Sequence, residues 1–261
     1  MPDLTGRTAI VTGGATLLGH GVVAELAAAG AAVVVADIDV EGGEKAAAQA
    51  ATITFIETDI TDDESLARTI ATVADSHGGI DIVVNLAAIY LDNGFDTTRA
   101  EWLTALDVNV VSMVETVRHA FDHLARSPHA AVVNFSSVSG NVAQTGRWTY
   151  PASKAAVAQL TRSMAMDLAE HGIRVNSVNP GWTWSKVMDE LSKGDRAKTD
   201  RVAAPFHLTR RVADPAEIGK VVVFLASDDA SVVTGADWAA DGGYSAMGPE
   251  SYVPAIPQLM E

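Results

Sequence analysis

Short apolar runs alternate along the chain with longer Ala- and Leu-rich stretches whose apolar residues recur at helical spacing. The short runs are rich in β-branched residues and almost continuously hydrophobic, which is typical of parallel strands covered on both faces. Strand alternating with helix over the whole length predicts a doubly wound α/β fold. The six clearest strand candidates are Thr8–Thr12, Ala32–Ala36, Ile53–Glu57, Ile80–Asn85, Ala130–Phe135 and Arg174–Asn179.

The helical stretches each end near a glycine or another helix breaker. With a last short strand near Asp237–Ala240, we expect a mainly parallel sheet of seven strands with helices on both faces. No shift in composition divides the chain, so residues 1–261 are predicted to form a single domain, with a substrate lid at about 182–212 and a C-terminal tail at 248–261. The predicted helices lie near 19–30, 41–50, 63–77, 99–126, 151–171 and 215–226.

Charge and composition narrow the classes of function. The 261 residues carry 33 acids against 18 Lys and Arg, a formal net charge of −15, which disfavours nucleic acid and anionic membranes as partners. Cysteine is absent, which excludes disulfide scaffolds, iron–sulfur clusters and cysteine nucleophiles. No signal-like N-terminus and no uninterrupted apolar run of membrane-spanning length occurs, so we expect a cytoplasmic protein.

A glycine-rich turn and an acid together suggest a dinucleotide site. The turn, residues 12–21, joins the first strand to the first helix, where backbone N–H groups meet a pyrophosphate in this fold. Glycines there also serve tight packing, so the turn alone is weak evidence. Asp37 ends the second strand, where an acid binds the adenosine ribose of NAD and repels the extra phosphate of NADP. No Lys or Arg lies in 13–21 or 37–40, so NAD is the predicted cofactor, the alternative being that Asp37 is only a solvated acid.

Tyr150 and Lys154 stand four residues apart at the start of a predicted helix, on one face and one turn from each other. Using a phenol as a base near neutrality requires about 4 kcal/mol of help, which an ammonium about 4 Å away supplies at an effective dielectric near 20. Such a pair is usually an ordinary surface pair. Here it follows a strand ending in Ser136-Ser137, at the edge of the sheet where ligands bind.

These motifs resemble those of the short-chain dehydrogenase/reductase family, and the resemblance runs from about Leu4 to Gly243. Family members place the serine thirteen positions before the tyrosine, which selects Ser137. The resemblance implies a Rossmann-type fold and a nicotinamide cofactor. The matching positions are Thr12, Gly13, Gly19, Asp37, Asp59, Ile60, Asn85, Ala87, Asn109, Ser137, Tyr150, Lys154, Asn179-Pro180-Gly181 and Asp241-Gly242-Gly243.

The resemblance also implies residue roles. Tyr150 exchanges the hydroxyl proton, Ser137 binds the substrate oxygen, and Lys154 lowers the tyrosine pKa and holds the nicotinamide ribose. Asn109 orders a water that relays the proton. The implied cofactor-binding residues are Gly13, Leu18, Gly19, Asp37, Ile38, Asp59, Ile60, Asn85, Ala87, Tyr150, Lys154, Pro180, Gly181, Thr183 and Ser185.

Three positions depart from the family pattern. Leu17 replaces the middle glycine of the turn, so the turn contacts with a cofactor are in question. Leu86 and Ala88 replace an asparagine and a glycine, which puts a structural hydrogen bond of the fourth strand in doubt.

Substrate contacts carry no motif and are predicted only from their place near the catalytic groups. The candidates are Asn141, Gln144, Arg147 and Trp148 before Tyr150, Trp182 and Trp184 after Pro180-Gly181, and Ile89-Tyr90 after the fourth strand. Trp182 packing the lid and Arg147 being a solvated surface side chain are the alternatives. His207, Arg210 and Arg211 are expected to pair with acids. No cluster of residues has convincing metal-ligand spacing, so no metal is expected.

The sequence thus predicts an oxidoreductase that moves a hydride between NAD and the carbinol or carbonyl carbon of a secondary alcohol, sugar, polyol or cyclic diol. The alternatives are an NAD-sensing regulator or scaffold without catalysis, and an NADP-linked ketone or 3-oxoacyl reductase. Relatives assemble through the helices near 99–126 and 151–171, so a homotetramer or homodimer is expected. Tyr252, Val253, Ile256 and Leu259 give the tail apolar residues that could dock on a neighbouring subunit.

Overall fold

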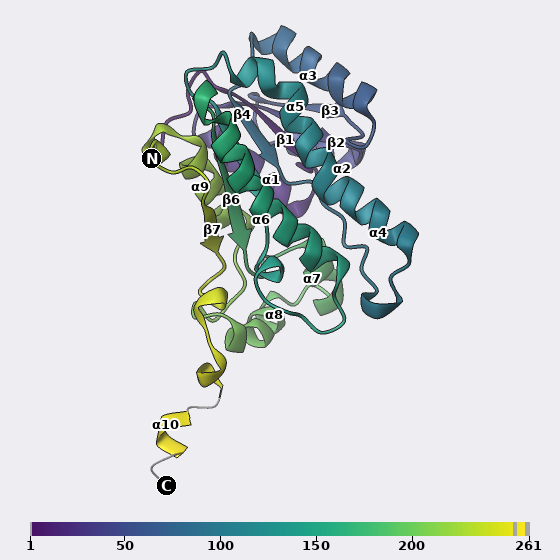
Figure 1. Cartoon of the computed structure of the whole chain (residues 1–261), viewed down its shortest axis with the longest axis vertical. Coiled ribbons are helices and arrows are strands. Elements are labelled where there is room, and N and C mark those ends of the chain that lie inside the picture. Colours follow the sequence, from purple (N-terminus) through teal and green to yellow (C-terminus); the bar gives the residue numbers. More distant parts are fainter. Residues whose placement is uncertain (1, 253–254, 259–261) are drawn as a thin grey trace.

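A computed structural model describes residues 2–252 and 255–258 and contains a sheet of seven strands (Figure 1). Every neighbouring pair is parallel, in the order β3-β2-β1-β4-β5-β6-β7, which confirms the doubly wound α/β fold. All carboxyl ends of the strands therefore lie at one edge. The strands are β1 (Thr8–Thr12), β2 (Ala32–Asp37), β3 (Ile53–Glu57), β4 (Ile82–Asn85), β5 (Ala131–Phe135), β6 (Arg174–Pro180) and β7 (Asp237–Ala240).

Helices cover both faces of the sheet and close two apolar cores. On one face, α1 (Leu17–Ala28) and α2 (Val40–Ala47) pack near β1, β2 and β3, and α9 (Pro215–Ala226) packs against α1, β5 and β6. On the other face, α3 (Asp63–His77), α5 (Ser112–Leu124) and α6 (Thr149–Leu168) form the second core. The central strands are thus buried on both sides, as their near-continuous hydrophobicity predicted.

The predicted helix 99–126 is divided in the structure. Helix α4 (Arg99–Leu106) begins with a capping box of Thr98 and Glu101. It passes into a π-helical turn, Asp107–Val111, before α5 begins at Ser112. Such turns often occur at functional sites, and this one carries Asn109.

The lid region contains two short helices, α7 (Lys186–Ser192) and α8 (Arg196–Ala203), which lie at the end of the molecule below the sheet (Figure 1). The expectation that His207 pairs with an acid is wrong. Its ring is buried, Nε2 accepts from the backbone N–H of Trp182 at 3.3 Å, and Nδ1 donates to the Ala203 carbonyl at 3.0 Å. Arg210 likewise donates to the Ala204 carbonyl, whereas Arg211 does pair with an acid, Glu217.

The described part of the tail touches the lid at Tyr252 and then leads away from the body of the molecule (Figure 1). Tyr252 donates a hydrogen bond to the Pro205 carbonyl at 3.2 Å, and α10 (Ala255–Gln258) follows. Val253 and Leu259 lie outside the described residues. No helix in the described part of the chain has both the length and the apolar character to cross a membrane.

Candidate active site

The turn between β1 and α1 is built for close approach of a ligand to the backbone. Gly13 has a left-handed φ of +73°, and a Cβ there would lie 2.5 Å from the backbone of Ala87. A Cβ on Gly19 would lie 2.5 Å from the Gly13 carbonyl oxygen. Thr16 caps α1 by accepting from the Gly19 N–H at 3.0 Å. Only glycine fits at either position, so the amides at this helix end stay accessible.

Leu17 does not disturb this turn. It is the first residue of α1, in a helical position that needs no glycine, and its side chain is 38% exposed. Leu18 is partly buried against the core below.

Asp37 ends β2 beside the same turn. One carboxylate oxygen accepts from the Ala15 N–H and the other from the Asp39 N–H, each at 3.0 Å. These bonds leave lone pairs on both oxygens, because each can accept more than one hydrogen bond. Ile38 follows with its side chain 68% exposed at the rim. The next acid, Asp39, is committed elsewhere, since it caps α2 through the Gly42 N–H.

A cavity lies at the carboxyl edge between β1, β4 and β5. Asn85 lines it, donating to Asn134 Oδ1 at 2.9 Å, while its own buried Oδ1 has no partner among the described residues. Such an orphan acceptor fits a polar ligand in the cavity. The lining residues are Thr12, Ile60, Asn85, Ala87, Val108, Asn109, Met113, Phe135, Lys154 and Val157.

Five of these ten lining residues were predicted from the sequence. Met113 and Val157 were missed, although they stand four residues after Asn109 and three after Lys154, a spacing that places them on the same helix faces. Asp59, beside Ile60, is exposed, and its carboxylate accepts from the N–H and hydroxyl of Thr61. Leu86 is buried in the core, and β4 is joined to β5 by the bond from Asn85 to Asn134.

Tyr150 and Lys154 lie together on the first turns of α6, both buried. The Lys154 ammonium sits 5.6 Å from the centroid of the Tyr150 ring and donates to the Phe135 carbonyl at 2.8 Å. Burial lowers the pKa of Lys154 to about 8. Ser137, two residues past the end of β5, accepts from the Ser139 N–H at 3.2 Å and lies close enough to Tyr150 to lower the pKa of its phenol. The structure therefore brings Ser137, Tyr150 and Lys154 together.

The phenol ring of a second tyrosine, Tyr90, covers that of Tyr150. The rings of Tyr90 and Tyr150 stack with centroids 4.5 Å apart and hydroxyl oxygens 3.5 Å apart. Burial raises the pKa of Tyr150 well above its ordinary value, and Tyr90 raises it further. Ser137 and the charge of Arg147 lower the pKa of Tyr150, but burial outweighs both.

Asn109 is buried in the π-helical turn, with its whole amide engaged by the protein. Its Oδ1 accepts from the Ile89 N–H at 2.8 Å, and Nδ2 donates to the Ile89 carbonyl and the Ser153 hydroxyl. The side chain thus ties the segment after β4 to α6. Its predicted role in ordering a water is untested by these contacts.

The end of β6 and the segment after it are held in place by contacts with β7 and the residue that follows it. Asp237 accepts from the hydroxyls of Ser136 and Ser177 and from the amide of Asn179. A Cβ on Gly181 would lie 2.7 Å from the Asp241 carbonyl, so Pro180-Gly181 passes tightly over β7. The other predicted carboxamide contacts follow: Thr183 is buried, and Ser185 caps α7 through the Met188 N–H.

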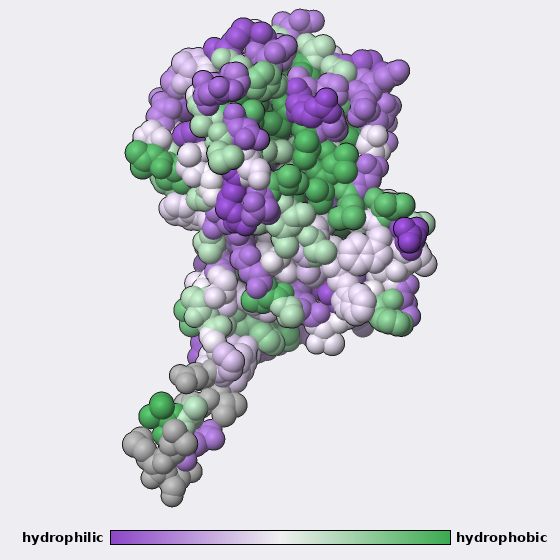
Figure 2. Space-filling model, viewed as in Figure 1, coloured by the Kyte–Doolittle hydropathy of each residue, from purple (hydrophilic) through white to green (hydrophobic). Residues whose placement is uncertain are grey.

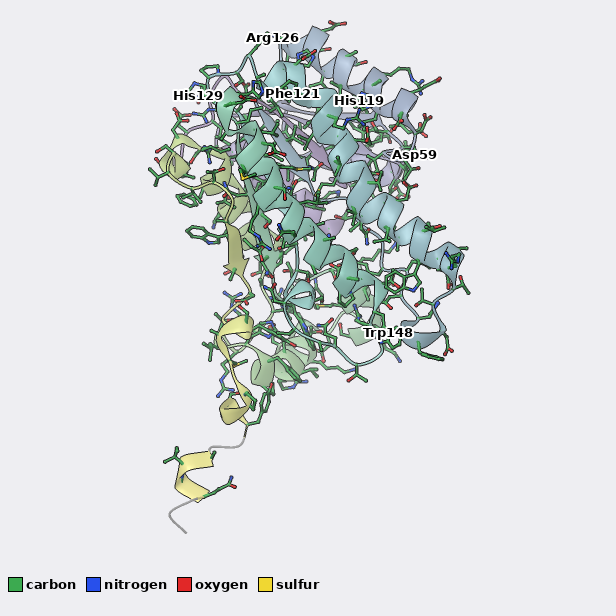
Figure 3. The ribbon with its side chains drawn as sticks, viewed as in Figure 1. Asp59, His119, Phe121, Arg126, His129 and Trp148 are labelled. Carbon is green, nitrogen blue, oxygen red and sulfur yellow. The ribbon has the colours of Figure 1, made fainter. Side chains whose placement is uncertain are left out.

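Most of the predicted substrate residues lie in two places, the loop before α6 and the lid. Asn141 and Arg147 are exposed on the loop before α6, and Gln144 accepts from the Ser139 hydroxyl at 2.9 Å. Trp182 instead packs inside the lid, with its ring stacked 5.5 Å from Phe206. Figure 3 labels Trp148 and Asp59, one from each side of the site. Trp148 lies beside the start of α6, whereas Asp59 lies far from it, near α3.

One group of donors in the described residues has metal-binding spacing. Ligand atoms of Asp63, Glu115 and His119 lie within 4.8 Å of one another. Glu115 already binds Arg118 through both carboxylate oxygens, at 2.7 and 2.8 Å. We assign no metal to this group.

Comparison with known proteins places the fold and site in context. A family model described as enoyl-(acyl carrier protein) reductase matches residues 13–245. The cis-4-hydroxycyclohexanecarboxylate dehydrogenase of Sinomonas cyclohexanicum is 36% identical over 92% of this chain and 97% of its own. The NADP-dependent (R)-specific alcohol dehydrogenase of Lentilactobacillus kefiri is 32% identical over 93% and 98%. The crystal structure of gox2181 superposes with a TM-score of 0.86 at 32% identity, covering 94% and 98%.

Proposed function

The chain belongs to the short-chain dehydrogenase/reductase family, and we propose that it is an NAD-dependent dehydrogenase of secondary alcohols. The observation that carries this proposal is the juxtaposition of Ser137, Tyr150 and Lys154 beside a cavity lined by Asn85 and Asn109. A regulator that only senses NAD needs no buried phenol beside a buried ammonium. We propose that residues 1–261 act as one domain.

In this proposal Tyr150 is the acid and base. Its hydroxyl takes the proton of the substrate alcohol in oxidation and returns it to the carbonyl in reduction. Ser137 donates a hydrogen bond to the substrate oxygen, which keeps that oxygen within reach of the phenol. The Lys154 ammonium stabilises the phenolate electrostatically and holds a ribose hydroxyl. We also propose that Asn109, which hydrogen-bonds to Ile89 and to Ser153 of α6, orders the water that relays the proton.

The residues fit a nicotinamide dinucleotide. When bound, its ring accepts or donates the hydride. The backbone of the Gly13–Gly19 turn would hold the pyrophosphate, and the orphan Asn85 Oδ1 supplies an acceptor in the cavity. Asp37 would bind the adenosine ribose and repel a 2′-phosphate. The other proposed contacts are Leu18, Ile38, Asp59, Ile60, Ala87, Pro180, Gly181, Thr183 and Ser185.

We propose a cyclic secondary alcohol as the substrate, with sugars and polyols as the other members of the class. The 36% identical relative is named for a hydroxycyclohexane carboxylate, and the exposed Arg147 near Tyr150 could meet such a carboxylate. Tyr90 offers an aromatic wall for a ring. Asn141 and Gln144 stay candidates as well, whereas Trp182 is the weakest because it packs within the lid.

Assembly and location rest on the sequence and the family. We propose a homotetramer or homodimer that uses the α4, α5 and α6 face, over which Figure 2 shows hydrophobic side chains gathering. Exposed Leu103 and Met166 lie on α4 and α6. A cytoplasmic location stays a prediction.

The test is NADH formation over a panel of cyclohexanol, 4-hydroxycyclohexanecarboxylate, a sugar and a polyol. Tyr150→Phe should abolish turnover while NADH still binds, measured by fluorescence titration, and Tyr90→Phe is the matched control that keeps the acid and base. Full activity of Tyr150→Phe would refute the mechanism. Turnover only with NADPH and a ketone would favour the reductase alternative. Binding of NAD without any turnover would favour the NAD-sensing regulator.

A further inference from the structure

Asp92 joins two segments that are far apart in the sequence. It follows β4 and precedes the short 3-10 helix Gly94–Asp96, 58 positions before Tyr150. One carboxylate oxygen accepts from the N–H groups of Trp148 and Gly94, at 2.9 and 3.0 Å. The other accepts from the N–H of Tyr150 at 2.9 Å. Both oxygens are thus used on backbone amides.

The amides of Trp148 and Tyr150 belong to the start of α6, where N–H groups have no acceptor within the helix. The residue at the N-cap position, Trp148, makes no side-chain cap. Asp92 supplies the missing acceptor from another segment, and a negative charge at a helix N-terminus is favourable. Burial alone would raise the pKa of Asp92, but the amide hydrogen bonds lower it below its ordinary value, so the group is an anion.

Further contacts show that these two segments are packed together and not merely linked. A Cβ on Gly94 would lie 3.0 Å from the Gly146 carbonyl oxygen. The rings of Phe95 and Trp148 meet edge to face at 5.7 Å. Tyr90, two residues before Asp92, stacks on the ring of Tyr150. We call residues 90–95 the clamp segment.

We propose that Asp92 is a positioning residue for Tyr150, fixing the backbone of the catalytic tyrosine to the clamp segment and so holding Tyr90 against its ring. This inference rests on the proposed function, in which the Tyr150 hydroxyl must meet the substrate oxygen held by Ser137. A small displacement of a catalytic group lowers the rate more than it lowers cofactor binding. Asp92 itself is not one of the residues that line the cavity.

The experiment compares Asp92→Ala and Asp92→Asn with Asp96→Ala. Asp96 is an exposed acid directly after the clamp segment whose side chain accepts no hydrogen bond within residues 2–252, so its replacement controls for the lost charge. For each protein we would measure kcat, the KM for NAD, NADH affinity, and hydrogen exchange of the amides at 148–150.

For Asp92→Ala we expect kcat to fall about 10- to 100-fold, with NADH affinity and the KM for NAD within about twofold of the original protein. Exchange at 148–150 should become faster. Asp92→Asn should be intermediate, because its single acceptor oxygen replaces only part of the contacts. Asp96→Ala should match the original protein in every measurement.

An unchanged kcat in Asp92→Ala would overturn the proposal, as would an equal loss in Asp96→Ala. If Asp92→Ala does not fold, Asp92→Asn decides: a lower kcat with unchanged NADH affinity supports the proposal, and an unchanged kcat overturns it. If the original protein turns over no alcohol at all, the proposed function fails, and hydrogen exchange alone decides whether Asp92 holds these amides.

Discussion

The charge of Asp37 should set the choice between NAD and NADP. A 2′-phosphate brought to within about 5 Å of this carboxylate would be repelled by about 3 kcal/mol per unit charge at an effective dielectric near 20. No Lys or Arg within 13–21 or 37–40 offsets this repulsion. Because 1.4 kcal/mol corresponds to a factor of ten, we expect kcat/KM to favour NAD by about 100-fold or more. Asp37→Asn should remove most of that preference, since the amide oxygen can still accept from the Ala15 N–H while the charge is lost.

The assay is the ratio of kcat/KM for NAD to that for NADP, measured with one alcohol in the original protein and in Asp37→Asn. Asp39→Asn is the matched control, two residues away and of equal charge, because its carboxylate caps α2 through the Gly42 N–H. Its ratio should stay within about threefold of the original, since charges farther away in water are screened. A ratio that Asp37→Asn leaves unchanged, or that Asp39→Asn shifts as strongly, would refute the assignment of specificity to Asp37.

Two further predictions concern the turn and an ion pair. Gly13→Ala should weaken NADH binding at least tenfold and destabilise the fold more than Gly78→Ala, because both glycines have a left-handed φ, of +73° and +80°, but only at Gly13 does a Cβ meet backbone. The Gly78 change should cost about 1–2 kcal/mol from backbone strain alone, measured by urea unfolding. Arg211 lowers the pKa of Glu217 to about 2, so the pair stabilises the fold above the ordinary Glu pKa of 4.5, and this contribution is lost as the pH falls towards 2. Glu217→Gln should therefore reduce the free energy of unfolding at pH 7 by less than about 1 kcal/mol, because both side chains are 42% exposed, and the difference should be smaller at pH 3.

Strands were predictable from the sequence to within about two residues because their hydrophobicity is continuous. Two of the predicted strands start early, at Ile80 instead of Ile82 and at Ala130 instead of Ala131. Asp81, just before β4, accepts from the Thr8 N–H through its side chain at 2.8 Å, while its backbone bonds to the Thr8 carbonyl and the Ala131 N–H. The π-helical turn at Asp107–Val111 was not predictable, because the apolar spacing of α4 and α5 continues across it.

In the candidate site, too, some residues were predictable from the sequence and others were not. Gly13, Asp37, Ser137, Tyr150 and Lys154 stand in motifs whose spacing is fixed by one strand or one helix, and local sequence can therefore reveal them. Asp92 binds amides 56 and 58 positions away, and no local pattern marks an acid in a loop as a cap for a distant helix. Trp182 packs against Phe206 and His207, which come from a segment whose fold the sequence does not indicate, so its surroundings were not predictable from local pattern.

The geometry also changes the account of how the phenol becomes reactive. Using Tyr150 near neutrality requires about 4 kcal/mol of help, and the Lys154 ammonium, whose nitrogen lies 5.6 Å from the centroid of the ring, is a positive charge that favours the phenolate. Part of that charge is already engaged by the Phe135 carbonyl, and burial acts against ionisation, so the pKa of Tyr150 is raised. Lys154 alone is therefore insufficient. Since Lys154 also lines the cavity in which the cofactor is proposed to bind, a second positive charge in that cavity would act on the same phenol. Proton transfer by Tyr150 should accordingly depend on occupancy of the cavity, with the oxidised cofactor binding before the alcohol is deprotonated.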